Sequence, residues 1–248
     1  MILLKTKEEI EIMRRAGRIV AHTLDMVGES IRPGMTTAQL DKLIDEFLRS
    51  HGAIPAFKNY QGFPAAACIS IDEEVVHGIP GDRVIKEGEI VSVDIGSIVD
   101  GYYGDSARTF AVGQVSSAKS RLMAVTQQAL QAGIDKARKG NRLGAISAAV
   151  QKVAEESGYG VVRQLVGHGI GRTMHEEPQV PNFGVDNDGP ILETGMVLAI
   201  EPMINMGTYE VKTLPDGWTV VTADGSPSAH FEHTVAITDD GPDTLTLS

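Results

Sequence analysis

Hydrophobic residues recur every three or four positions through the first fifty residues and then give way to short apolar runs. Thr6 followed by Glu9 is typical of a capping-box helix start, and an apolar stripe continues over residues 10–27. A second stripe predicts a helix over about 36–51. Strand-like runs then follow at 53–57, 67–71, 89–97 and 104–112. The pattern predicts a unit of two helices followed by a sheet.

The same pattern returns in the second part of the chain. A helix is predicted over roughly 118–138, and in the helix after it Ile146 matches Leu40 at an offset of 106 residues. Glu201 matches Asp94 at an offset of 107, in each case at the end of a matched strand. A matched acid on a matched strand indicates a duplication. We therefore expect two halves, about 1–113 and 114–248, related by a pseudo-twofold axis.

A tight turn sets the geometry of the first-half strands. Asp100-Gly101 between two apolar runs is a strong hairpin signal, and a two-residue loop places position 96 opposite position 105. Asp94 and Asp105 then share one face as diagonal neighbours, roughly 5–8 Å apart. In the second half the matching hairpin runs from Glu201 to Glu232 and is longer. The added residues, 207–221, are predicted to form an extra strand pair near the site.

Bulk composition narrows the class of protein. The chain has 248 residues, of which 42% are hydrophobic and 22% charged, as in an ordinary globular protein. The net charge of −11 argues against DNA or RNA as the main partner. A single cysteine, Cys68, excludes an internal disulfide and favours a cytoplasmic location. Neither a signal peptide nor an apolar run of roughly 20 residues for a membrane span is present. We expect one catalytic domain over 1–248, with no N-terminal extension.

Four carboxylates and one imidazole are the strongest candidates for chemistry. An acid within an apolar strand is costly to bury unless something pairs with it, and a lone strand acid more often has no function. Several acids on matched strands, with a histidine between glycines, point to a shared pair of divalent ions. Such an oxygen-rich set suits Mn, Fe(II), Co or Zn. The predicted ligands are Asp94, Asp105, His168, Glu201 and Glu232.

Other candidate residues are weaker when considered alone. His77 and His175 lie in irregular stretches, where a histidine is most often solvated. The segment around His175 is not an HExxH zinc motif, because position 179 is Gln. Tyr60, Phe63 and Trp218 are more often packing residues than pocket residues. The glycine-rich runs match neither a phosphate loop nor a dinucleotide fingerprint.

Five segments together carry a family resemblance that spans nearly the whole chain: CISIDEEVVHGIPG (68–81), VDIG and DGYYGDS (93–106), GHGIGRTMHEEPQVPN (167–182), GMVLAIEPM (195–203) and HFEHT (230–234). The chain resembles the pita-bread metallopeptidases of family M24, and in detail the type I methionine aminopeptidases. The resemblance implies an α+β pita-bread fold, with two helix–helix–sheet halves around a central antiparallel sheet. We also expect a monomer.

The resemblance assigns roles to the candidates. The five predicted ligands match the family's metal ligands for two divalent ions (Co²⁺, Mn²⁺, Fe²⁺ or Zn²⁺), with Asp105 and Glu232 as the bridging pair. His77 matches the histidine at the scissile amide, and His175 the one near the substrate carbonyl. From the chemistry of the site, a carboxylate such as Glu201 could shuttle the proton. A metal-bridged water or hydroxide is expected to attack the scissile carbonyl. The residues that match the methionine pocket are Tyr60, Phe63, Cys68 and Trp218, with Met174 where the family often has Phe.

The implied reaction is removal of the initiator methionine from nascent proteins whose second residue is small and uncharged. An Xaa-Pro peptidase of the prolidase or aminopeptidase P class shares the five ligands but is a longer protein. A type II methionine aminopeptidase carries a helical insertion, for which the 33 residues between His168 and Glu201 leave little room. A non-catalytic binding relative would be expected to have lost ligands. A transient contact with the ribosome stays open.

Overall fold

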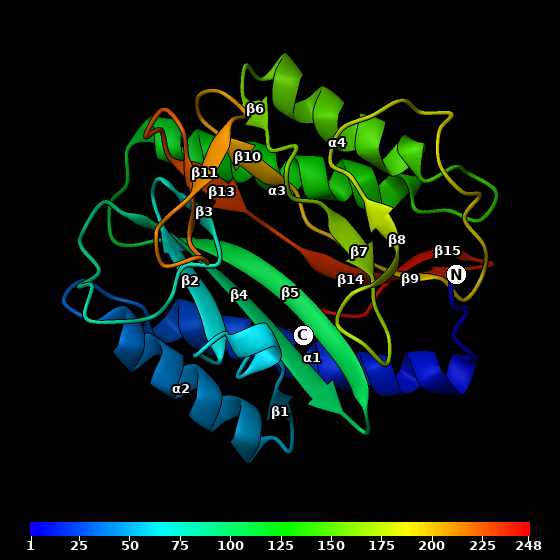
Figure 1. Ribbon diagram of the computed structural model, residues 1–248, viewed down its shortest axis with the longest axis horizontal. Coiled ribbons are helices and arrows are strands. Elements are labelled where there is room, and N and C mark those ends of the chain that lie inside the picture. Colours follow the sequence, from blue (N-terminus) through cyan, green and yellow to red (C-terminus); the bar gives the residue numbers. More distant parts are fainter.

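Two helix pairs lie on opposite sides of a set of antiparallel strands in the computed structural model, which describes residues 1–248 (Figure 1). The first pair is α1 (Lys7–Ser30) and α2 (Thr37–Ser50), and the second is α3 (Ser117–Lys136) and α4 (Gly144–Glu156). The predicted capping box between Thr6 and Glu9 is present at the start of α1. A second capping box, between Thr36 and Gln39, starts α2. The helix predictions are therefore confirmed.

The first-half sheet is built on a long hairpin. Strands β4 (Ile90–Val99) and β5 (Tyr102–Ala111) pair along their whole length across the Asp100-Gly101 turn. Strand β2 (Ala67–Ile71) pairs with the other edge of β4. The strand predicted at 53–57 is wrong in extent, because β1 covers only Ile54–Pro55. Pro55 has no N–H to donate, and beyond it the Ala56 N–H donates to Gly96 O at 2.9 Å.

The second-half sheet has the same core order. Its strands are β7 (Gly167–Gly169), β8 (Glu176–Val180), β9 (Val197–Ile200), β14 (His233–Thr238) and β15 (Gly241–Thr244). They lie in the order β15-β14-β9-β7-β8, and every pairing is antiparallel. The run β14-β9-β7 thus repeats β5-β4-β2 of the first half. The predicted duplication is present in the topology.

Short strands fill the long connection of the second half. Strands β11 (Val211–Thr213) and β12 (Val220–Thr222) form the predicted extra pair, and β12 also pairs with β3 (Glu74–Val76) of the first half. Strand β10 (Met203–Asn205) pairs with β13 (Ser228–His230) and with β6 (Gly160–Val161). A short 3₁₀ turn, Tyr60–Gly62, follows β1. The connection between β9 and β14 therefore builds one wall of the molecule.

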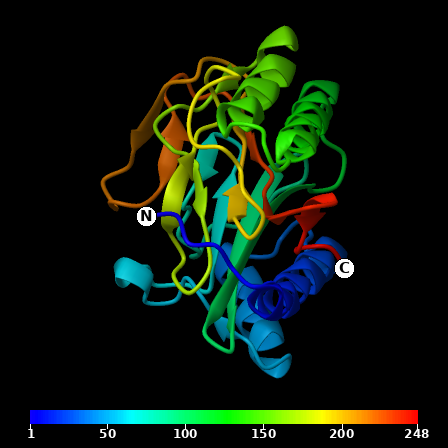
Figure 2. The same cartoon turned by 90° about the vertical axis from the view of Figure 1, so that its right-hand side faces the viewer.

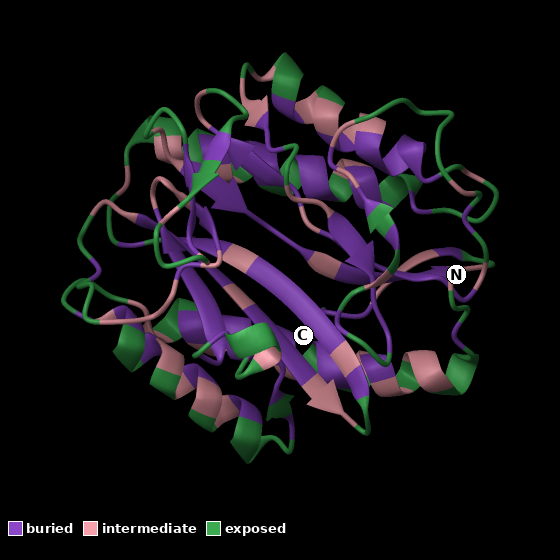
Figure 3. Ribbon diagram, in the orientation of Figure 1, coloured by how far each residue is buried: buried purple, intermediate pink, exposed green.

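Each half buries its own hydrophobic core. One core lies between the first-half helices and strands β2, β4 and β5, and another lies between α3, α4 and the second-half strands. A third cluster contains Met13, Phe57 and Val197, and so joins the two halves. Buried positions concentrate on the strands and exposed ones on the outer faces of the helices (Figure 3). Figure 2 shows the helix pairs one above the other and the chain ends on opposite sides. None of the helices combines the length and the apolar character needed to cross a membrane.

Candidate metal centre

All the residues predicted for the site line one pocket. The pocket encloses about 180 Å³ and is lined by 14 residues. Its residues come from both halves, because the pocket lies where the first-half strands β2, β4 and β5 face the second-half strands β7 and β9. The predicted residues that it brings together are Tyr60, Phe63, Cys68, His77, Asp94, Asp105, His168, His175, Glu201, Trp218 and Glu232.

The register of the β4–β5 hairpin places two acids on the same face, as predicted. Asp94 lies opposite Ala107, and Gly96 lies opposite Asp105. Gly96 is required at that position, because a Cβ there would lie 2.7 Å from the Phe57 ring and 2.9 Å from the Met174 methyl group. The two aspartates therefore reach the pocket from a strand pair whose register is fixed by its turn.

The acids of the pocket are buried without enough protein partners. Asp105 is 4% exposed and Glu232 is 2% exposed. Asp94, Asp105 and Glu232 each have one carboxyl oxygen without a hydrogen-bond partner. Burial, and then the charge of neighbouring acids, raises the pKa of Asp94, Glu201 and Glu232 well above the usual range. Burial raises the pKa of Asp105 to about 7. Without a cation these carboxyl groups hold protons, so the site is built for positive charge.

His168 directs a lone pair at the same acids. Its Nδ1 lies 2.9 Å from the carbonyl oxygen of Gly169 and must donate to it, because a carbonyl oxygen only accepts. Nε2 is then unprotonated in the neutral ring, and it lies 3.5 Å from Glu201 Oε1 and 3.9 Å from Asp105 Oδ2. A proton or a metal ion between these atoms would remove the repulsion of their lone pairs, and only a metal ion would be held by all of them at once.

The donor atoms are also close enough to share an ion. One ligand atom each from Asp105, His168 and Glu232 lies within 4.8 Å of the others. Bonds of about 2.0–2.2 Å place two ligand atoms of one ion at most about 4.4 Å apart, so the donors of the metal-free site already lie close to a metal's ligand spacing. The orphaned carboxylate oxygens, the lone pair of His168 and the spacing of the donors all fit a divalent metal centre. Asp94 and Glu201 line the same pocket and extend the donor set.

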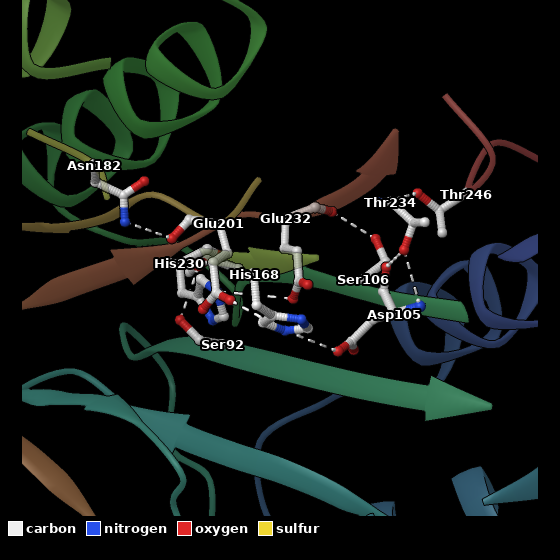
Figure 4. A network of polar contacts seen from close by, with 11 residues as sticks. Ser92, Asp105, Ser106, His168, Asn182, Glu201, His230, Glu232, Thr234 and Thr246 are labelled. Carbon is white, nitrogen blue, oxygen red and sulfur yellow. Dashed lines mark hydrogen bonds and ion pairs between the residues drawn. The ribbon is translucent and has the colours of Figure 1, made fainter. Parts of the chain in front are cut away.

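Hydroxyl groups connect the two halves beside the acids (Figure 4). Thr234 Oγ1 donates to the carbonyl oxygen of Asp105 at 2.7 Å and accepts from its N–H at 3.1 Å. Ser106 Oγ donates to the carbonyl oxygen of Glu232 at 2.6 Å, and Glu232 N–H donates to Ala107 O at 3.0 Å. We call this row of bonds between β5 and the β13–β14 segment the seam. It holds the backbones of Asp105 and Glu232 against each other.

Two further imidazoles lie at the pocket. The Tyr60 hydroxyl lies 2.8 Å from His175 Nδ1, and the rings of His168 and His175 have centroids 4.3 Å apart. His77 has a left-handed backbone, with φ of 59°, which directs an otherwise strand-like segment into the pocket. Burial lowers the pKa of both His77 and His175. Both rings are therefore neutral near pH 7 and can donate one hydrogen bond each.

An apolar wall completes the pocket. Phe63 and Trp218 meet edge to face, with ring centroids 5.1 Å apart and an interplanar angle of 73°. Cys68 and Met174 are buried beside them. Burial raises the pKa of the Cys68 thiol, so it is protonated and acts as a small apolar group. This wall suits an unbranched, polarisable side chain.

Three features of the pocket escaped the sequence analysis. Phe57 and Gln61 also line it. His168 pairs with Ala199, and the equivalent strand position in the first half is Ser70, which pairs with Ser92. The symmetry mate of His168 is thus a serine. A buried histidine, His230, lies beside the acids, and its spacing of two residues from Glu232 could have indicated a shared face.

Comparisons with known proteins agree with this geometry. The model of metallopeptidase family M24 matches residues 11–239. A methionine aminopeptidase of Clostridium acetobutylicum is 56% identical over 248 residues, covering 100% of this chain and 99% of the relative. Methionine aminopeptidase 1 of Bacillus subtilis is 52% identical over 246 residues, covering 99% of each.

Solved structures of similar proteins have the same fold as this chain. The crystal structure of methionine aminopeptidase from Rickettsia prowazekii superimposes with a TM-score of 0.98 at 45% identity, covering 100% of both chains. Prolidase from Pyrococcus furiosus shares the fold with a TM-score of 0.81 at 25% identity. That match covers 99% of this chain but 65% of the prolidase. The pita-bread fold predicted from the resemblance is therefore confirmed.

Proposed function

Because this chain belongs to metallopeptidase family M24, we propose that it is a methionine aminopeptidase, which hydrolyses the peptide bond after an N-terminal methionine. Full-length relatives with this name support the activity. The observation that carries the proposal is the meeting of five metal-ligand candidates, two neutral imidazoles and an apolar wall in one pocket of about 180 Å³. No part of this set lies elsewhere in the molecule.

The proposed cofactor is a pair of divalent ions. Asp105 and Glu232 would bridge them, since the seam holds these two residues against each other from opposite halves. The other ligands would be Asp94, His168 and Glu201. The oxygen-rich set with one imidazole suits Co²⁺, Mn²⁺, Fe²⁺ or Zn²⁺. When bound, such ions lower the pKa of a water molecule toward neutrality and polarise a carbonyl group.

The side chains around the ions would bind the substrate and move its protons. Glu201 would take the proton released on attack at the carbonyl carbon and deliver it to the leaving amine, because its carboxylate lines the pocket within reach of both positions. If the Tyr60 hydroxyl donates to Nδ1 of His175, the ring carries its proton on Nε2 and can donate to the scissile carbonyl oxygen. His77 would contact the scissile amide from the opposite half.

The apolar wall would select methionine at the first position. A thioether packs favourably against aromatic edges, which Phe63 and Trp218 supply, with Tyr60 and Cys68 beside them. We propose that the second residue must be small and uncharged, because a pocket of about 180 Å³ that also holds the ions leaves little room beyond the methionine side chain.

The cellular setting is proposed in the same way. We propose that the chain acts as a monomer in the cytoplasm on nascent proteins, with a transient ribosome contact and without DNA or membrane partners. The single reduced cysteine and the net charge of −11 support this setting.

The test uses protein freed of metal with a chelator and reloaded anaerobically with each ion. Met-Ala-Ser and Met-Gly-Met-Met should be cut after methionine, while Leu-Ala-Ser, which lacks the thioether, should be cut far more slowly. Metal analysis should show up to two ions per chain. Cleavage of Xaa-Pro peptides with Met-Ala-Ser left intact would instead assign the prolidase activity. Turnover that persists without metal would overturn the hydrolytic centre.

A further inference from the structure

One buried imidazole that the proposed reaction does not use faces two of the acids. His230 ends β13 and is 1% exposed. Its Nε2 has no hydrogen-bond partner and lies 3.9 Å from Glu201 Oε2 and 4.0 Å from Glu232 Oε2. Leaving a buried polar atom without a partner destabilises the folded state. The placement of this ring between two carboxylates therefore needs a reason.

The backbone of His230 is held rigidly by a neighbouring hydroxyl. Thr109 Oγ1 accepts from the N–H of His230 at 2.9 Å and donates to its carbonyl oxygen at 2.8 Å. Ser92 Oγ lies 2.8 Å from Thr109 Oγ1 and must be the donor, because the single proton of Thr109 is already used. All three bonding positions of Thr109 are filled. The ring is thus attached to a fixed point between β4, β5 and β13.

Glu201 lies between two imidazoles that offer it different groups. His168 directs an unprotonated Nε2 at Oε1, because Gly169 O holds the proton of this ring on Nδ1. Nε2 of His230, by contrast, has no hydrogen-bond partner in the protein and faces Glu201 Oε2. Carboxylate oxygens accept and never donate, so the Nε2 of His230 that faces two of them is suited to carry a proton.

We propose that His230 is a positioning residue of the metal centre, whose Nε2–H donates to the outer oxygens of Glu201 and Glu232 when ions are bound. This inference rests on the proposed function, since it requires that the carboxylates be metal ligands. The present separations are about 1 Å longer than a hydrogen bond, so the two carboxylates would have to rotate toward the ring when the ions bind. The bond would fix which oxygen of each glutamate remains for the ions.

Two variants separate the hydrogen bond from the volume of the ring. His230→Gln keeps an N–H donor at a similar reach, whereas His230→Leu keeps bulk and removes the donor. Calorimetric titration of the demetallated proteins with Mn²⁺ should show affinity reduced roughly 10–100-fold for H230L. The affinity of H230Q should stay near that of the unchanged protein. Equal weakening in both variants, or none in H230L, would overturn the inference.

The unchanged protein supplies a second readout if H230L does not fold. Nitrogen-15 NMR of histidine-labelled, Zn²⁺-loaded protein reports which ring nitrogen carries the proton. We expect His230 to carry it on Nε2 and His168 to be metal-bound through Nε2. Metal bound to Nε2 of His230 would overturn the positioning role and make it a ligand. Failure of the unchanged protein to bind Mn²⁺ or Zn²⁺ would overturn the proposed function itself, a result distinct from the other two.

Discussion

The two halves of the molecule share one plan but use it differently. In the first half, β4 and β5 form an uninterrupted hairpin across a two-residue turn and deliver Asp94 and Asp105. In the second half, β9 and β14 pair in the same way, but the chain leaves them at Glu201 and returns at Glu232. The strands β10–β13 occupy that connection.

Because the β4–β5 turn is short and the β9–β14 connection is long, the two halves contribute different kinds of residue to the site. The first half contributes acids on a rigid frame, and the residue equivalent to His168 is Ser70. The second half adds the imidazole ligand candidate, His230 and the pocket residue Trp218. Pseudo-symmetry thus relates Asp94 to Glu201, whereas the same register places Ala107 at the position of Glu232 and His230 at the position of Asp105. The remaining donors and the apolar wall are departures from symmetry that come from both halves.

The largest expected effect tests whether the bridging acids are equivalent. Asp105→Asn and Glu232→Gln should each lower both turnover and metal affinity by more than roughly 100-fold. Mutation of a residue that only orients a metal ligand already lowers metal affinity or activity roughly 10–100-fold. Peptide cleavage and metal analysis measure both. The exposed Asp135→Asn on α3 is the matched control. Full activity in either bridging variant would break the equivalence.

A smaller effect is expected from the imidazoles that flank the ions. His175→Ala should lower kcat by roughly 10²-fold while both ions are retained, because it removes a hydrogen-bond donor to the reacting carbonyl. The exposed His22→Ala on α1 should leave kcat unchanged. Steady-state kinetics together with metal analysis make the test. Loss of metal in H175A would show that His175 is a ligand and that the second half supplies two imidazole ligands.

Removing the ions should make stability depend on pH. Burial raises the pKa of Asp105 from 3.8 to about 7 in the folded chain, and the pKa of Glu201 and Glu232 rises in the same direction. Between pH 3.8 and about pH 7 the folded state therefore binds more protons than the unfolded state. The free energy of unfolding contributed by these groups is highest at low pH and falls as pH rises toward about 7.

Thermal unfolding measures this effect. The Tm of chelator-treated protein should fall by several degrees between about pH 5 and pH 7, and metal-loaded protein should show a much smaller change. D105N should weaken the pH dependence of the demetallated protein. A Tm that rises with pH in the demetallated protein would contradict the raised pKa values of both halves.

The smallest effect concerns the hydroxyls between the halves. Thr234→Val and Thr109→Val each leave a buried N–H and carbonyl group unpaired and should lower the free energy of unfolding by about 1–3 kcal/mol. Thr213→Val, on an exposed position of β11, is the control. Urea unfolding measures all three. T234V should also weaken metal binding, because it frees the backbone of Asp105; equal metal affinity in T234V and T213V would show that the seam is structural only.

Local chemistry was enough to predict much of this arrangement. The Asp100-Gly101 turn sets the β4–β5 register, so the shared face of Asp94 and Asp105 followed from counting residues. The capping boxes mark both first-half helices. The acids in apolar strands indicated a common site, because burial leaves them few other partners.

The features that the sequence did not predict are contacts and backbone conformations that depend on how segments far apart in the sequence pack together. The contact of Thr234 with Asp105 joins residues 129 positions apart and exists only because the halves dock in one register. Ser70 could not be matched to His168, because β2 and β7 have different lengths and unrelated sequences. Gln61 lies in the pocket through a left-handed backbone that no pattern of the sequence indicates.

The turn at Asp100-Gly101 has a consequence for which parts of this chain can change in length. One extra residue there would exchange the inner and outer faces of β5 and carry Asp105 away from the pocket. The connection between β9 and β14 lacks this restriction, because its ends are held by strand pairing and not by a turn. New segments can therefore be added after β10 without disturbing the acids. The range of substrates can therefore change through insertions between β9 and β14, while the length of the β4–β5 hairpin stays the same.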